Sequence, residues 1–276
     1  MLAALIIVFR EVFEAGLIIG IVLAVTRSVP HRNRWIGGGV IAGAAAACVV
    51  AAFAGALSRL FAGMGQELFN AAILGVAVVM LTWHNVWMAQ HGRELAADMR
   101  AIGQAVADGS KPLLALAVVV GVAVLREGSE VALFLYGIVA SDGGSAASLT
   151  IGGIIGLALG AGVCLLTYYG LMRIPPRPLF ATTTVLITLL AAGMAAQAAA
   201  FLERANWLTA LDTVVWDSEW LLSDKSVGGR ALHTLIGYTD QPTVMQLVVY
   251  VAVLLATVLL MRLTGSQRSS SAAAIG

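Results

Sequence analysis

Residues 1–25 read MLAALIIVFREVFEAGLIIGIVLAV, an apolar run that carries three charged side chains near its middle. A helix needs about 20 mostly apolar residues to cross a membrane, and this run is long enough. No basic leader precedes its apolar part, so we expect a retained transmembrane span and not a cleaved signal peptide. The central charges Arg10, Glu11 and Glu14 then need partners inside a helical bundle.

The composition of the whole chain indicates an integral membrane protein. Of the 276 residues, 60% are hydrophobic and only 11% are charged, whereas roughly a quarter of the residues are charged in a typical soluble protein. The net charge of +1 gives no sign of a nucleic-acid partner. The two cysteines stand alone in apolar runs, so neither a disulfide framework nor a Cys-x-x-Cys metal site is expected.

The number and direction of the spans follow from hydropathy and charge. Seven segments are long and apolar enough: residues 2–25, 36–61, 68–88, 113–139, 149–172, 179–202 and 244–263. The alternating pattern of a membrane β-barrel is absent, so we expect an all-α polytopic membrane protein with seven transmembrane helices. Ten Lys and Arg residues flank one side of these spans and four flank the other, which places the N-terminus outside and the C-terminus in the cytoplasm.

The remaining segments predict one membrane domain over residues 1–265 and a disordered Ser- and Ala-rich tail over residues 266–276. Residues 89–111 are polar and compatible with a helix, and we expect a cytoplasmic connector there. The longest loop, residues 203–243, belongs to the outer side. Six of its apolar residues recur at helical spacing and predict a short amphipathic helix: Trp207, Leu208, Leu211, Val214, Val215 and Leu222.

A second charged cluster lies in the fourth apolar segment. Residues 126–130 read REGSE and residues 10–14 read REVFE, so both follow the pattern R-E-x-x-E at membrane depth. In the first span, the three central charges make the free energy of membrane insertion less favourable by about 8–10 kcal/mol, while the apolar residues favour insertion by only about 4–8 kcal/mol. Such a span is marginal alone, so its charges must face the interior of the bundle.

The spacing within the motif suggests how the charges are satisfied. On a helix, the two glutamates lie at i and i+3 on one face, and the arginine lies four residues before the second glutamate. If the two motif faces meet, four carboxylates and two guanidiniums carry a net charge of −2, which a divalent cation neutralises. We therefore predict a cation pathway with the metal ligands Glu11, Glu14, Glu127 and Glu130 and the supporting residues Arg10 and Arg126. The alternative is that the Arg–Glu clusters serve only as structural ion pairs between helices.

The positions of the two motifs also suggest an internal repeat. Spans 1 and 4 are three positions apart, so they run in opposite directions through the membrane. This arrangement predicts a 3+3 inverted repeat with halves over about residues 1–111 and 112–203 and with span 7, residues 244–263, added. Transporters of this kind place their site at the interface of the repeats near the midplane.

The paired motifs resemble those of the oxidase-dependent iron permease family, which includes fungal high-affinity iron permeases, bacterial EfeU-type iron importers and relatives described as lead permeases. LTWHNVWM at 81–88, AAGMAAQA at 191–198 and IGYTDQP at 236–242 are similar to further segments of the bacterial branch. The resemblance implies a permease domain that imports ferric or ferrous iron across a bacterial inner (plasma) membrane, with the four motif glutamates handling the ion. It also implies a partner, either an iron oxidase or a periplasmic iron-binding protein. A permease for lead or another divalent cation is the alternative.

Three residues are secondary candidates for the site. His84 lies between Trp83 and Trp87, and a role in packing or at the membrane interface is favoured over one facing a pore. Asp217 and Glu219 on the outer loop are the nearest match to an acidic motif of the resembled family. They either collect cations at the entrance or are simply solvated.

Other patterns bear on packing and on enzymatic activity. Small residues every four positions predict close helix packing at Gly152, Gly156 and Gly160. The sequence contains no HExxH, GxSxG or P-loop pattern. We therefore expect a transporter that is not an enzyme and that holds no cofactor besides the iron it transports.

Overall fold

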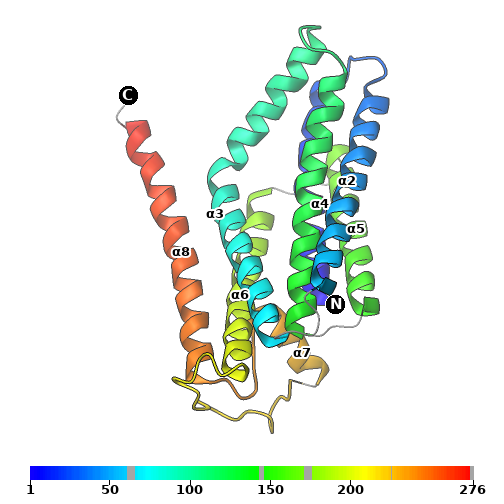
Figure 1. Cartoon of the computed structure of the whole chain (residues 1–276). Coiled ribbons are helices and arrows are strands. Elements are labelled where there is room, and N and C mark those ends of the chain that lie inside the picture. The colour runs from blue at the N-terminus through cyan, green and yellow to red at the C-terminus, as the bar shows by residue number, and fades with distance from the viewer. Residues whose placement is uncertain (61–65, 143–145, 171–175, 225, 274–276) are drawn as a thin grey trace.

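The computed structural model spans residues 1–276 and describes all of them except 61–65, 143–145, 171–175, 225 and 274–276 (Figure 1). The described residues form eight helices: α1 (Leu2–Val25), α2 (Arg32–Leu60), α3 (Gln66–Ala107), α4 (Leu114–Asp142), α5 (Ala146–Tyr168), α6 (Pro176–Arg204), α7 (Val227–Ile236) and α8 (Val244–Ala273). No β-strand occurs among the described residues, although one isolated antiparallel bridge pairs Val214 with Thr243. The all-α prediction is confirmed.

Five helices are long and apolar enough to cross a membrane: α2 over Arg32–Ala56, α3 over Glu67–Met88, α5 over Ala146–Tyr168, α6 over Ala181–Arg204 and α8 over Val244–Leu263. The helices α1 and α4 are also long enough, at 24 and 29 residues, but each holds the three charged residues of an R-E-x-x-E motif. Length and composition therefore mark the chain as a membrane protein and set the two motif helices apart from the other five.

The long helices run alternately in opposite directions (Figure 1). The N-terminus lies near the end of the bundle that carries α7, and the C-terminus lies toward the other end. The helix α1 packs along α5, α2 along α4, and α3 along α6, while α1 and α4 also contact each other and α3. The two motif helices therefore meet inside the bundle.

Small residues allow the close contact between α1 and α5. Gly152, Gly156 and Gly160 are buried on α5 and face the backbone of α1. A Cβ atom added to Gly156 would lie 3.0 Å from the backbone nitrogen of Phe9, one residue before the motif. The predicted close packing is confirmed, and it presses α5 against the side of α1 that does not carry the charged cluster.

Glycines on α2 make the corresponding contact with α4. A Cβ atom added to Gly39 would lie 3.0 Å from the Cα atom of Ala117. One turn further along α2, a Cβ atom on Gly43 would lie 2.9 Å from the Cβ atom of Val124. Each motif helix thus packs against a glycine-rich neighbour on the face away from its charged residues. The charged face of each motif helix is left to point toward the interior of the bundle.

Two polar segments are largely helical: residues 89–111, which are compatible with a helix in sequence, and the tail, which the sequence predicted to be disordered. The expected connector over residues 89–111 is mostly a continuation of α3, which runs for 42 residues to Ala107. The expected disordered tail over residues 266–276 continues α8 as far as Ala273, and residues 274–276 lie outside the described part. Both segments contain alanine and no proline, so a helix that has already formed can propagate through them.

The outer loop corrects another expectation. Its helix is α7, whereas the apolar residues 207–222 that predicted an amphipathic helix lie in irregular structure. Leu211 has a φ of 63°, in the left-handed region that a right-handed helix does not use. The following β-branched residues favour extended backbone. Accordingly, Val215 N donates a hydrogen bond to Pro242 O at 2.9 Å, and Val244 N donates one to Thr213 O at 3.0 Å.

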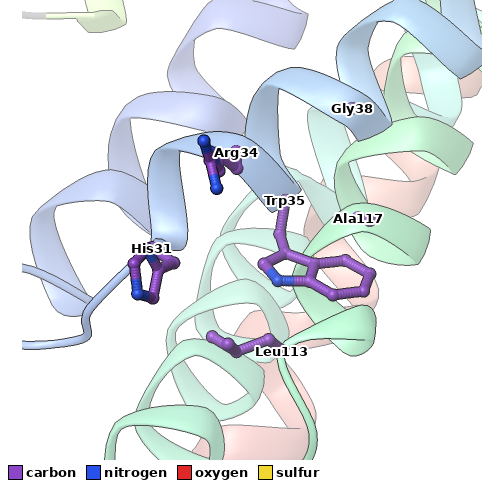
Figure 2. Close-up of a pocket in the computed structure, with 6 residues that line it drawn as sticks. All are labelled: His31, Arg34, Trp35, Gly38, Leu113 and Ala117. Atoms are coloured by element: carbon purple, nitrogen blue, oxygen red, sulfur yellow. The ribbon is translucent and has the colours of Figure 1, made fainter.

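A pocket of about 630 Å³ lies between the first turns of α2 and α4 (Figure 2). Its lining residues are His31, Arg34, Trp35, Gly38, Leu113 and Ala117. None of the R-E-x-x-E residues lines this pocket, so it is separate from the charged cluster described next.

Candidate metal centre

The motif on α1 is fully enclosed. The side chains of Arg10, Glu11 and Glu14 are no more than 2% exposed. Arg10 Nε lies 2.9 Å from Glu14 Oε1, and Arg10 Nη1 lies 3.5 Å from Glu11 Oε1. The pairing at i and i+4 that the spacing predicted is therefore present. One guanidinium serves two carboxylates, so this half of the cluster carries a net negative charge.

The motif on α4 repeats this pairing in a more open position. Arg126 Nε lies 3.2 Å from Glu130 Oε1 and 3.7 Å from Glu127 Oε1. The side chain of Arg126 is 30% exposed and that of Glu130 is 15% exposed, whereas that of Glu127 is 3% exposed. The Arg126 guanidinium also lies over the Trp87 ring, 4.4 Å from its centroid, and Nη2 donates to the sulfur of Met88 at 3.6 Å. The α4 motif is therefore the less buried half of the cluster, through Arg126 and Glu130.

His84 of α3 enters between the two motifs. Its side chain is 4% exposed, and its Nδ1 atom pairs with Glu130 Oε2 on α4. Its Nε2 atom lies 3.6 Å from Glu14 Oε2 and 4.0 Å from Glu11 Oε2 on α1. Sequence analysis favoured a packing or interface role for this histidine, but the structure places it in contact with carboxylates of both motifs.

The four motif glutamates do not contribute equally to the cluster. One ligand atom from each of Glu11, His84, Glu127 and Glu130 lies within 4.8 Å of the others. Glu14 is absent from this tight group and instead forms the shortest ion pair of Arg10. The structure therefore brings the two motifs together as predicted and adds a ligand from a third helix.

Several polar atoms of the cluster have no hydrogen-bond partner among the described residues. They include both carboxylate oxygens of Glu11 and of Glu127 and the Nε2 atom of His84. Leaving a buried polar atom without a partner costs about 1–3 kcal/mol, and more for a charged group. Such atoms are usually paired in proteins, so this set of oxygens and one nitrogen is well suited to surround a cation.

Sequence reasoning also missed a neighbour of the cluster. Asn85 follows His84 on α3, is 1% exposed, and has no hydrogen-bond partner among the described residues at either amide atom. The available signal was the spacing of three or four residues from Leu74 through Val78 and Leu81, which continues the interior face of α3 to this position.

The outer-loop acids lie apart from the cluster. Asp217 and Glu219 are exposed on the irregular part of the loop. The Oδ1 atom of Asp217 accepts a hydrogen bond from Glu219 N at 3.0 Å, and its Oδ2 atom accepts one from Gln241 Nε2 at 3.0 Å. The structure thus gives Asp217 a role in holding the loop together and brings neither acid to the motif glutamates.

A pocket of about 390 Å³ reaches the cluster between α3 and α4. Its lining residues are Val79, Met80, Trp83, His84, Trp87, Arg126 and Glu130. No residue of α1 lines it. Arg126, Glu130 and His84 are thus the accessible part of the cluster, and Glu127 and the α1 motif are the enclosed part.

The chain is similar to known proteins over most of its length. The model of the iron permease FTR1 family matches residues 1–267. The chain belongs to the iron permease FTR1 family. A ferrous iron permease EfeU of Escherichia coli O6:H1 is 31% identical over 255 residues, which cover 91% of each chain. A ferrous iron permease EfeU of Yersinia pestis is 30% identical over 278 residues, covering 99% of this chain and 98% of that protein. No solved structure gives a significant match.

Membership in the iron permease family confirms the resemblance drawn from the paired motifs. The family and the names of the relatives point to a transporter rather than an enzyme. They also agree with the apolar helices, which indicate a membrane protein.

Proposed function

We propose that this chain imports iron across a bacterial inner membrane through a site made by its two R-E-x-x-E motifs. One observation carries the proposal: carboxylates of α1 and α4 meet in the interior of the bundle with oxygens that have no hydrogen-bond partner among the described residues. The ferrous ion is the proposed form of the substrate because both relatives compared above are named ferrous iron permeases. An iron oxidase or a periplasmic iron-binding protein is the proposed partner.

The proposed topology has seven spans, formed by α1 to α6 and α8, with the N-terminus outside and the C-terminus in the cytoplasm. The excess of Lys and Arg on one side of the spans supports this orientation. The alternating directions of the long helices support an odd number of spans with the termini on opposite sides (Figure 1). The cross-pairing of α1 with α5 and of α2 with α4 is what an inverted 3+3 repeat would produce, because exchanging the two halves converts one pair into the other.

The difference between the two motifs gives the site a simple mode of action. An ion first meets Glu130 and His84, which line the pocket, and then exchanges its water for the enclosed carboxylates of Glu11 and Glu127. Arg10 and Arg126 reduce the negative charge of the ion-free site. Because that charge is limited, the site can release an ion as well as bind one, which conduction requires.

Uptake of radioactive iron by proteoliposomes tests this proposal. We expect Glu11→Gln and Glu127→Gln each to reduce uptake at least about 10-fold at equal protein content. The matched control is Glu219→Gln, an exposed loop acid outside the cluster, which should retain uptake. Competition by excess lead, zinc or manganese would show whether iron is the preferred ion.

Thermal stability separates transport from a structural role. Glu11 and Glu127 have carboxylate oxygens without hydrogen-bond partners in the described structure, so a neutral amide of similar shape relieves a desolvation cost. A pathway role therefore predicts lost uptake with unchanged or higher melting temperature. Unchanged uptake together with a lower melting temperature would refute the pathway and assign the glutamates to structural ion pairs.

A further inference from the structure

We infer that His84 binds the transported ion through its Nε2 atom and that this nitrogen makes the site prefer borderline divalent cations such as Fe²⁺ over hard cations such as Mn²⁺ and Mg²⁺. The inference rests on the proposed function, since it concerns the same site. It adds a ligand outside the R-E-x-x-E motifs. This ligand would determine the selectivity of the site among divalent ions.

The Nε2 atom of His84 lies where an ion would need a ligand. It is buried, has no hydrogen-bond partner among the described residues, and lies 3.6 Å from Glu14 Oε2 and 4.0 Å from Glu11 Oε2. Nitrogen and oxygen ligands bind first-row divalent ions at about 2.0–2.2 Å. Two ligands of one ion can therefore be at most about 4.4 Å apart. Both separations fall within this limit, so an ion fits between His84 and either carboxylate with little movement.

The imidazole ring of His84 is held in one orientation by Glu130. The Nδ1 atom of His84 pairs with Glu130 Oε2, and the other oxygen of Glu130 lies 3.2 Å from Arg126 Nε. A carboxylate at one ring nitrogen orients the ring, and a metal bound at the other nitrogen takes the place of the hydrogen there. This carboxylate–histidine arrangement is the usual way in which proteins orient a histidine ligand. Glu130 thus acts as a positioning residue as well as a member of the cluster.

The chemistry of the ligand atoms bears on which divalent ion the site prefers. Carboxylate oxygens alone favour hard ions such as Mg²⁺, Ca²⁺ and Mn²⁺, whereas imidazole nitrogen favours Fe²⁺, Ni²⁺, Cu²⁺ and Zn²⁺. The tight group contains three carboxylates and one imidazole. The imidazole is therefore the one member of this group that discriminates between Fe²⁺ and Mn²⁺ by its chemistry.

A direct test examines the ligands of bound iron. The full-length protein is loaded with one equivalent of Fe²⁺ without oxygen, and iron K-edge X-ray absorption is recorded. We expect the multiple-scattering signal of imidazole in the wild type and its loss in His84→Gln. The matched control is His91→Gln on the same helix, because His91 stacks on Trp87 and its Nδ1 atom lies 3.2 Å from Trp87 O, outside the cluster. Imidazole scattering that persists in His84→Gln would overturn the inference.

A second variant guards against misfolding. In His84→Asn the side-chain amide can still donate to Glu130, but nothing replaces the Nε2 atom. In His84→Gln an oxygen can take the place of the Nε2 atom. Size-exclusion profiles of both variants establish that the fold is retained, and the result from whichever variant folds decides the test.

Competition during uptake tests the selectivity. We expect the preference for Fe²⁺ over Mn²⁺ to fall at least about 10-fold in His84→Gln and to stay unchanged in His91→Gln. An unchanged preference in a folded His84 variant would overturn the inference. If Glu11→Gln still abolishes uptake in that case, the proposed function stands and only the role of His84 is refuted. If Glu11→Gln retains uptake, the proposed function and the inference fall together.

Discussion

Replacing Arg10 with methionine should destabilise the protein far more than the same change at Arg126. Arg10 is 2% exposed and pairs with two carboxylates, at 2.9 Å from Glu14 and 3.5 Å from Glu11. Removing it leaves two buried carboxylates without compensation, and breaking a buried pair in this way costs about 3–5 kcal/mol. Arg126 is 30% exposed and lines the pocket between α3 and α4, so its carboxylates are less enclosed than those of Arg10 and its loss should cost less.

These values translate into a measurable difference in melting temperature. At about 2–4 °C per kcal/mol, the Arg10→Met change should lower the melting temperature by about 10 °C, and the Arg126→Met change should lower it by less. The assay is thermal unfolding in detergent without added metal, followed by the fluorescence of the six tryptophans. Adding Glu14→Gln to Arg10→Met should recover part of the loss because it removes one unpaired charge. Equal losses for the two arginines would refute the reasoning from burial.

Two further predictions concern packing and pH. Gly156→Leu should prevent α5 from packing against α1 and reduce the folded fraction in size-exclusion profiles. Gly162→Leu should leave the folded fraction unchanged, because an added Cβ atom there meets no atom within 4 Å. Equal profiles for the two variants would contradict the packing argument. Burial and the neighbouring Asp240 raise the pKa of Asp224 in the outer loop, so its protonated form stabilises the fold at low pH and this stability is lost as the pH rises. Asp224→Asn should therefore raise the melting temperature, increasingly so at higher pH, and a pH-independent difference would argue against this cause.

The features that sequence could predict are those set by local periodicity. The spacing of Arg10, Glu11 and Glu14 fixes a shared helix face, and the four-residue spacing of the α5 glycines fixes another. Both hold in the structure because a helix maps sequence spacing directly onto its faces. The cost of burying charge then forces the motif faces inward, whatever the details of the bundle.

The features that sequence could not predict depend on contacts between distant segments. The spacing on α3 places His84 on an interior face, but only the packing of α3 against α1 and α4 brings it to the glutamates of both motifs. The apolar residues of the outer loop have helical spacing, yet backbone hydrogen bonds to residues 240–244 hold that segment extended. In both cases, tertiary partners override the local pattern.

The glycine contacts of α1 with α5 and of α2 with α4 have a consequence for how the site opens. Each charged helix is fastened to a helix from the opposite half of the chain. The halves therefore cannot swing apart as separate bodies without breaking close backbone contacts. The units that can tilt relative to each other are instead the crossed pairs α1–α5 and α2–α4, and the boundary between them passes through the carboxylate cluster. In the proposed pathway, an ion bound by Glu11 of α1 and by Glu127 or Glu130 of α4 would hold the two pairs together across this boundary, and its release would let them tilt.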